Sequence, residues 1–336
     1  MKHIGKSYDK VDAKGILSGK PSYTGDFVPK DALIIKVLRS PHAQARIKSI
    51  DTSKAKLIPG VEAIFTYEDV PNTRFTLAGQ TYPEPSAYDA LILEPVVRYV
   101  GDEVALVVAK DEATALKAMP LIKVEYEVQK PVLDLRTAID HETIVHPEDD
   151  ILNHIPVGQD YKRNICVSYH KRVGDIEGEL AKCDYVVEGT YFDQATRQSA
   201  MEPFQSFGYI DHLGRIVIVS STQIVFHVRR HIARALGIPA SKIRVIKPRI
   251  GGGFGSKQTA CTELMTAFVT WKLQKPCYLL YDRTEAQTCS TTRHAREWYI
   301  RVGATKDGII QVIDMDSITD AGAHATHCFT TTTAGE

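Results

Sequence analysis

The chain has 336 residues, of which 43% are hydrophobic, so it can bury one or two full cores. Its 41 basic residues balance its 41 acidic residues, and a formal net charge of zero provides no bulk field to attract nucleic acid or an anionic membrane. A small or neutral partner is the more natural expectation.

The N-terminus begins with polar sequence and shows no signal peptide, and no stretch approaches the roughly 20 apolar residues of a membrane helix. The six cysteines are widely spread, without a C-x-x-C pair of the kind that holds zinc or an iron–sulfur cluster. We therefore expect a cytoplasmic protein, with any redox metal held by other means or on another chain.

The first third of the sequence alternates β-rich runs with short polar connections. A helix is predicted at 111–119, because it starts with an acidic residue and stops at Pro120. The apolar and β-branched runs predict strands at 33–38, 61–65, 104–108 and 121–126. Residues 1–130 are thus expected to form a compact α/β domain.

Residues 131–164 contain many prolines, histidines and acidic residues and sustain no apolar period, so they are interpreted as a solvated linker. A metal site formed by His141, His146 and His154 is the alternative interpretation, but the spacing of these histidines is not of a metal-binding type. The linker separates the first domain from a second one at 165–336.

The second domain is predicted to begin with strands and continue with two strand-turn-helix units. One helix has its apolar residues on one face and ends at Gly237. A second helix is predicted at 259–273. The strands are predicted at 185–191, 207–210, 216–219 and 243–246, and a β-hairpin at 298–302 and 309–313. This pattern implies a layered α/β domain.

The glycine-rich run 251–255 follows the strand at 243–246. Three consecutive glycines permit positive φ and let a ligand approach the main-chain N–H groups, and the following helix would add its own N-terminal donors. A tight structural turn is the alternative. The run fails the P-loop pattern, because Lys257 follows Ser256 instead of a glycine, and it fails the dinucleotide pattern, which needs Gly or Ala at 256.

Residues 249–258, with Gly252, Gly253, Phe254 and Gly255 at their centre, resemble the molybdopterin-binding loop of the xanthine dehydrogenase and aldehyde oxidase family. Further segments resemble the same family in the same order: 39–47, 99–105, Met201-Glu202-Pro203 and 220–223. The resemblance implies a hammerhead-type α/β domain followed by an incomplete layered α/β molybdopterin-binding domain.

The resemblance also assigns roles to residues. The side chain of Gln223 would contact an oxo ligand of molybdenum and the N–H groups around Phe254 the same centre, whereas the pterin sulfurs ligate the metal. Gln258 occupies a position near the substrate, where some purine-oxidising relatives carry glutamate; an ordinary residue at a helix start is the alternative. Glu202 is either a residue supporting the site or a buried structural acid, and Arg293-His294 either a family segment or an exposed strand-edge pair.

The implied function is part of the molybdenum subunit of a purine or N-heterocycle hydroxylase, which inserts oxygen from water and passes electrons to [2Fe–2S] and FAD on partner subunits. A relative that oxidises aldehydes or carbon monoxide is one alternative, and a non-catalytic protein that binds a phosphate-bearing ligand or a partner is another. The general-base glutamate and a substrate arginine match nothing in this chain. We therefore expect a split subunit or a fragment, inactive alone and completed by a C-terminal partner.

Overall fold

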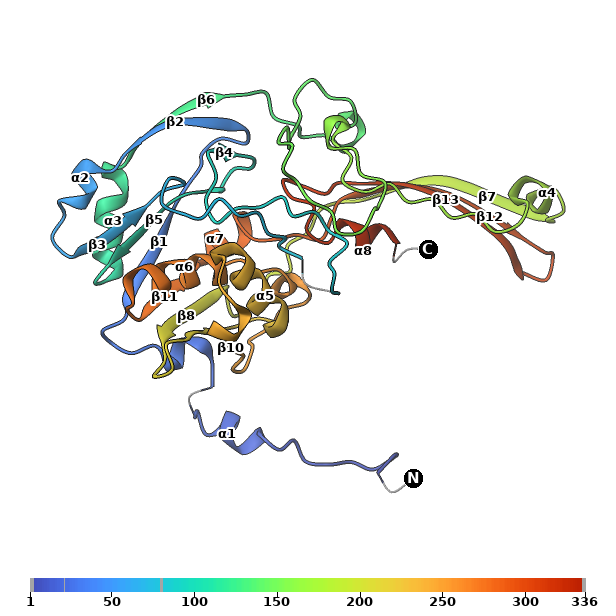
Figure 1. Cartoon of the computed structure of the whole chain (residues 1–336). Helices are drawn as coiled ribbons and strands as arrows, with labels where there is room; N and C mark the ends of the chain where they lie inside the picture. The colour runs from blue at the N-terminus through green and yellow to red at the C-terminus, as the bar shows by residue number, and fades with distance from the viewer. Residues whose placement is uncertain (1–2, 21, 79–80, 334–336) are drawn as a thin grey trace.

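A seven-stranded mixed sheet forms the centre of the computed structural model, which describes residues 3–20, 22–78 and 81–333 (Figure 1). Its strands are β1 (Leu33–Arg39), β3 (Val61–Phe65), β5 (Glu103–Ala109), β8 (Gln205–Ile210), β9 (Ile216–Ser220), β10 (Ile243–Ile246) and β11 (Cys277–Leu280). Their order is β10-β9-β8-β11-β1-β5-β3. Because β1 runs parallel to β11, the sheet is continuous across the two predicted domains, and the domain boundaries stay a proposal.

Both faces of this sheet are buried, as the apolar run of β5 requires. Successive side chains of a strand point to opposite faces. Leu106 packs in the core under α5 (Val225–Leu236) and α6 (Glu263–Leu273), whereas Val107 packs in a separate cluster under α3 (Glu112–Ala118). Each such fully buried side chain stabilises the fold by roughly 1.5–3 kcal/mol relative to exposure. Helices on both faces therefore give the layered α/β architecture expected from the sequence.

A second sheet has three strands and lies on the opposite side of the molecule from the N-terminus (Figure 1). It consists of β2 (Ala45–Asp51), β4 (Val96–Val97) and β6 (Lys123–Val128), in the order β4-β2-β6, and α2 (Ser53–Lys56) follows β2. The strand predicted at 121–126 thus begins two residues later, because Leu121 belongs to a 3₁₀ turn.

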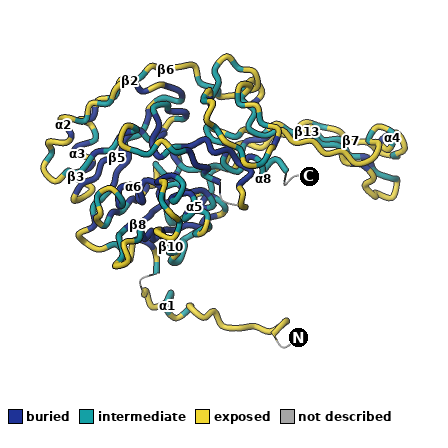
Figure 2. Tube along the Cα trace, in the orientation of Figure 1, coloured by how far each residue is buried: buried dark blue, intermediate teal, exposed yellow. Residues whose placement is uncertain are grey.

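The third sheet is a long arm that projects from the body of the molecule (Figure 1). It joins β7 (Tyr185–Asp193), β12 (Arg296–Ala304) and β13 (Ile310–Thr319) in the order β13-β12-β7, with α4 (Ile176–Leu180) near its tip. The strands β12 and β13 form the predicted antiparallel hairpin. Most residues of β7 are exposed, and Figure 2 shows exposed and intermediate residues along the whole arm.

Three short helices complete the described chain: α1 (Ala13–Leu17), α7 (Arg283–Thr288) and α8 (Cys328–Thr333). The predicted ends of two other helices are confirmed. The side chain of Asp111 accepts a hydrogen bond from the N–H of Thr114 at the start of α3, and Gly237, with φ +64°, ends α5. None of the helices in the described residues is long and apolar enough to cross a membrane.

The linker at 131–164 contains two 3₁₀ turns, Leu135–Thr137 and Tyr161–Arg163, and isolated β-bridges at Leu152 and Asp160, but no longer helix or strand. Its interpretation as solvated throughout was wrong at His146, which is only 8% exposed. The segment packs between the body and the residues before α8, and apolar periodicity could not reveal that burial because the contacts made by His146 are polar.

Candidate functional site: the glycine loop

The glycine loop, residues 251–255, follows β10 and takes a backbone course that side chains with a Cβ rarely adopt. The φ angles of Gly252 and Gly255 are +105° and +91°, and Phe254 between them also has a positive φ of +51°. For a residue other than glycine, such a conformation costs of the order of 1–2 kcal/mol. The loop therefore carries strain at Phe254, whose side chain is 75% exposed.

The loop presents main-chain donors. Ser256 closes the turn, since both its N–H and its hydroxyl donate to the carbonyl oxygen of Gly253, at 2.9 and 2.7 Å. By contrast, the four N–H groups from Gly252 to Gly255 donate to no other described residue. Consecutive free N–H groups in a concave turn form an anion-binding surface. The geometry of the loop is compatible with both interpretations given above, a ligand-binding surface and a tight structural turn.

Glu202 holds the start of the loop. Its Oε2 accepts the N–H of Gly251 at 2.6 Å, and its own N–H donates to the carbonyl oxygen of Gly251 at 3.0 Å. A Cβ added to Gly251 would lie 2.6 Å from the Cβ of Glu202, so only glycine permits this approach.

Lys257 holds the end of the loop and is bound to the same carboxylate. Its Nζ lies 3.1 Å from Oε2 of Glu202 and 3.0 Å from the Glu202 carbonyl oxygen, with a side chain only 1% exposed. Burial lowers the pKa of Lys257, and the charge of Glu202 opposes that shift. Of the two alternatives for Glu202, the structure thus supports a residue that supports the site by holding both ends of the loop in position.

Gln223 lies against the loop, as the sequence predicted. Its N–H donates to the carbonyl oxygen of Lys257 at 2.9 Å. A Cβ at Gly253 would lie 2.5 Å from Oε1 of Gln223, so the absence of a side chain there creates the space for the amide. Gln223 follows β9 and the loop follows β10, and these neighbouring parallel strands end at the same edge of the sheet.

Gln258 closes the 3₁₀ turn after the loop, where its N–H donates to the carbonyl oxygen of Gly255 at 3.1 Å. It is half-buried, and its backbone also bonds His327, just before α8. His327 lies 3.1 Å from Oγ1 of Thr259, and burial lowers its pKa. His327 could not be identified from the sequence, because no local pattern links it to Thr259, 68 residues earlier.

The helix after the loop differs from the prediction. It begins at Glu263 rather than at 259, so residues 259–262 separate its N-terminus from the 3₁₀ turn. The buried carboxylate of Glu263 accepts the N–H groups of Cys261 and Thr262, at 3.0 and 3.1 Å, and the hydroxyl of Ser220 at 2.6 Å. The N–H groups just before the helix thus bind the protein's own carboxylate, and the contribution of the helix's own N-terminal donors to a ligand of the loop stays an expectation.

Arg293 and His294 do not form one exposed strand-edge pair, because only Arg293 is exposed. The side chain of Arg293 is exposed and donates to the carbonyl oxygen of Gln194, as in a strand-edge pair. His294 is half-buried with Nδ1 2.6 Å from the carbonyl oxygen of Asp320, and burial lowers its pKa.

Of the three linker histidines, only His146 joins a cluster with metal-ligand geometry. Ligand atoms of Asp89, His146 and His324 lie within 4.8 Å of one another. Two of these groups are already bonded, because Nε2 of His146 is 2.7 Å from the Ala323 carbonyl oxygen and Oδ2 of Asp89 accepts the N–H of Ala325 at 2.7 Å. We therefore describe the cluster as a buried ion-pair network.

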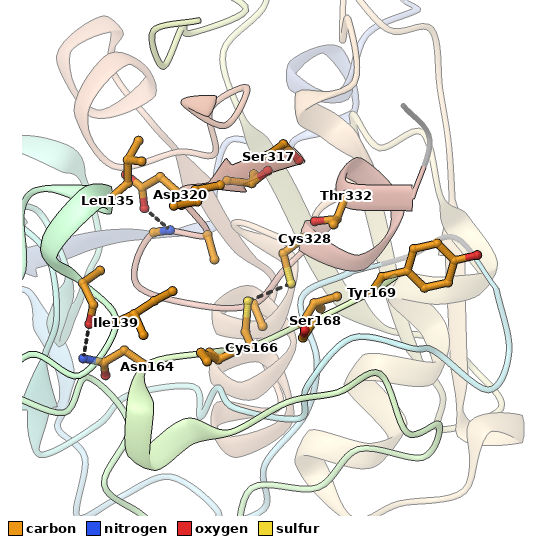
Figure 3. Close-up of a pocket in the computed structure, with 18 of the residues that line it drawn as sticks. Leu135, Ile139, Asn164, Cys166, Ser168, Tyr169, Ser317, Asp320, Cys328 and Thr332 are labelled. Carbon is orange, nitrogen blue, oxygen red and sulfur yellow. Dashed lines mark hydrogen bonds between the residues drawn. The ribbon is translucent and has the colours of Figure 1, made fainter. Parts of the chain in front are cut away.

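Two cavities lie near these groups. The larger, of about 1110 Å³, is bounded by the linker, β13 and α8, and Figure 3 shows part of its lining. The smaller, of about 270 Å³, reaches Thr259, Cys261 and His294, just beyond the loop. Neither of these two cavities is lined by Gln223 or by residues 252–255, and the side chains of Gln223 and Phe254 are exposed.

Comparisons with known proteins agree with this geometry. The family model described as molybdopterin cofactor-binding domain matches residues 157–335, and the one described as aldehyde oxidase and xanthine dehydrogenase, a/b hammerhead domain, matches residues 18–130. These matches confirm the two fold types that the sequence implied and their order.

Individual relatives are similar to nearly the whole chain. "Probable hypoxanthine oxidase XdhD" of Escherichia coli K12 is 38% identical over 97% of this chain and 37% of its own length. The "Nicotinate dehydrogenase large molybdopterin subunit" of Eubacterium barkeri is 31% identical over 96% of this chain and 72% of its own.

A solved structure, the aldehyde oxidoreductase of Desulfovibrio gigas, shares the fold with a TM-score of 0.79 and 24% identity, covering 94% of this chain and 34% of its own. The chain thus spans little more than a third of two of these three proteins. It belongs to the molybdopterin cofactor-binding family of the xanthine dehydrogenase and aldehyde oxidase type.

Proposed function

We propose that this chain supplies one wall of the molybdenum-cofactor site in a hydroxylase that oxidises a purine or a related N-heterocycle. The observation that carries the proposal is the row of four N–H groups at 252–255, which donate to no other described residue and lie beside the amide of Gln223, in a chain of this family. When bound, the cofactor would supply the two-electron oxidation of a carbon centre with oxygen derived from water.

The residues of the chain would bind and orient that cofactor. The N–H groups around Phe254 and the amide of Gln223 are hydrogen-bond donors that suit the oxygen atoms of an anionic group. Glu202 and Lys257 fix the two ends of the loop, so the donors are held in place before the ligand arrives. The pterin sulfurs, and no side chain of this chain, would ligate the metal.

Gln258 would contact the substrate. An amide donates and accepts at once, so it can pair with the edge of a heterocycle that offers both a ring nitrogen and an oxo group. The 38% identity to a protein named as a hypoxanthine oxidase supports a purine. It favours this class over an aldehyde, because the aldehyde oxidoreductase at 24% identity supports the fold alone.

Further polypeptide would complete the site. We propose that it carries the substrate arginine and the general-base glutamate, and that separate subunits or domains hold [2Fe–2S] and FAD. The exposed apolar side chains of the arm support a covering partner, since contiguous apolar surface is typical of interaction sites. Tyr185, Val187, Tyr191 and Ile313 are exposed on one face of the arm sheet.

The proposal is tested on tagged chain purified from its own cells, with the metal, pterin, iron and flavin content measured in the complex and hydroxylation assayed with hypoxanthine, nicotinate and an aldehyde. We expect stoichiometric molybdenum and pterin, iron and flavin from copurifying chains, and preferred turnover of hypoxanthine. A molybdenum-free complex that binds an ordinary nucleotide would contradict the cofactor assignment. Preferred turnover of the aldehyde would contradict the substrate class alone, and full turnover by this chain without partners would contradict the need for completion.

A further inference from the structure

Two cysteine thiols from distant parts of the chain are in contact at the wall of the larger cavity. Sγ of Cys166 lies 3.1 Å from Sγ of Cys328, although the residues are 162 positions apart. Figure 3 shows the two side chains pointing toward each other, one from the segment just after the linker and one from the start of α8. Both are free thiols.

The contact is preorganised by the backbone on both sides. Next to Cys166, the N–H groups of Ile165 and Ser168 donate to the carbonyl oxygens of Asp160 and Val157, at 2.9 and 2.8 Å. The N–H of Cys328 donates to the Ala325 carbonyl oxygen at 3.2 Å. A disulfide has a sulfur–sulfur bond of roughly 2.05 Å, so the two sulfurs need to approach by only about 1 Å.

The pair is specific within the chain. Sγ of Cys183, Cys277 and Cys289 each contact an oxygen atom, of Glu179, Lys275 and Thr288 respectively. Among the described residues, no other two cysteine sulfurs are within contact distance. Oxidation under native conditions is therefore directed at one pairing.

We propose that Cys166 and Cys328 form a reversible disulfide that links α8 to the segment just after the linker, across one wall of the cavity. The oxidant is a low-molecular-weight disulfide such as oxidised glutathione. One thiolate of the pair attacks a glutathione sulfur and releases the first reduced glutathione. The second thiolate then attacks the mixed disulfide and releases the other, so two protein thiols are oxidised and one glutathione disulfide is reduced.

The order of the two attacks follows from accessibility. Cys166 is half-buried, whereas Cys328 is only 2% exposed, and both line the open cavity. Cys166 therefore receives the glutathione. The hydrogen bond from Cys166 and burial raise the pKa of the Cys328 thiol, and the charge of Asp89 raises it further. Because the thiolate is the nucleophile, closure accelerates as the pH rises.

The test treats the purified chain with oxidised glutathione under native conditions, alkylates the remaining thiols and measures intact mass and linked peptides. We expect the loss of two hydrogens, four alkylated cysteines of the six, and a Cys166–Cys328 cross-link that dithiothreitol removes. The oxidised chain melts several degrees higher, because the bond closes a long loop in the unfolded state.

Three variants separate this outcome from general thiol reactivity. Cys328→Ser stops at a mixed disulfide of glutathione on Cys166, and Cys166→Ser keeps residue 328 reduced. Cys183→Ser, the matched control, forms the cross-link like the wild type. Six alkylated cysteines after native oxidation, or a cross-link between other positions, would overturn the proposal and leave a thiol–thiol hydrogen bond only.

Discussion

Oε2 of Glu202 accepts the main-chain N–H of Gly251 at 2.6 Å and the ammonium of Lys257 at 3.1 Å, so one carboxylate oxygen ties both ends of the glycine loop together. The relation joins residues 49 positions apart in the chain. These contacts of Glu202 hold the main-chain N–H groups of the glycine loop in fixed positions.

We expect Glu202→Gln to lower the free energy of unfolding by roughly 3–5 kcal/mol, because it leaves the buried ammonium of Lys257 without its charged partner. It is also expected to reduce the cofactor content, since the loop loses its anchor. Chemical denaturation and metal analysis measure the two effects. Glu68→Gln, at an exposed position, is the control and should change neither. If the Glu202 variant kept both its cofactor content and its free energy of unfolding, the carboxylate would be dispensable.

Two glycine substitutions separate steric from backbone effects in the loop. Gly253→Ala places a Cβ 2.5 Å from Oε1 of Gln223, so it displaces an exposed side chain and is expected to cost little stability but much of the cofactor content. Gly255→Ala meets no atom within 4 Å but forces alanine to φ +91°, at a cost of roughly 1–2 kcal/mol. Equal effects of the two variants on both quantities would contradict this assignment.

Glu263 satisfies three donors in the core, and its loss is expected to be costly. Glu263→Ala leaves the N–H groups of Cys261 and Thr262 without their acceptor and removes the shorter of the two hydrogen bonds of the Ser220 hydroxyl, which costs roughly 3 kcal/mol or more. Burial raises the pKa of Glu263, so the neutral Glu263→Gln, which keeps an oxygen acceptor, should cost less than half as much. Urea denaturation tests the ranking, and a costlier glutamine variant would refute it.

The Asp89–His324 pair is expected to weaken as the pH rises. Burial lowers the pKa of His324, but the carboxylate of Asp89, 3.5 Å from its Nδ1, outweighs burial and raises the pKa above the usual value. A histidine with a raised pKa stabilises the fold below its unfolded pKa of roughly 6.5 and loses that contribution as the pH rises through the folded pKa.

The difference in free energy of unfolding between the wild type and His324→Gln should therefore be largest near pH 6 and shrink at higher pH. Urea titrations at each pH measure this difference, and the exposed control His212→Gln is titrated in the same way. The pKa of Asp89 is lowered despite burial, chiefly by the neighbouring His324, so its own contribution is lost only in acid, below roughly pH 4. The titration stays above that range. A difference that grows with pH would contradict the pairing.

The sequence predicted the parts of the fold that local patterns determine. Apolar alternation located β1, β3, β5 and β7 to β10 to within a few residues, and Gly237 marked the end of α5. The parallel pairing of β1 with β11 could not be predicted, because Leu33 and Cys277 are brought together by the packing of the whole sheet and no local signal marks β11.

The candidate site divides in the same way. Gln223 and the glycine loop were found by pattern and resemblance, and the structure places them together. The anchoring role of Glu202 and Lys257 and the burial of His146 depend on contacts between distant segments. The helix start at Glu263 was missed because a carboxylate folds back onto its own N-terminus, which a dipole argument from residue types does not foresee.

The most direct test of the central claim is the molybdenum and pterin content of the purified complex, compared between the wild type and Gln223→Ala combined with Gly253→Ala. If the loop and its glutamine hold the cofactor, the wild type contains stoichiometric molybdenum and the variant loses about tenfold or more while its unfolding transition is preserved. Equal molybdenum in both proteins, or none in the wild-type complex, would contradict the claim.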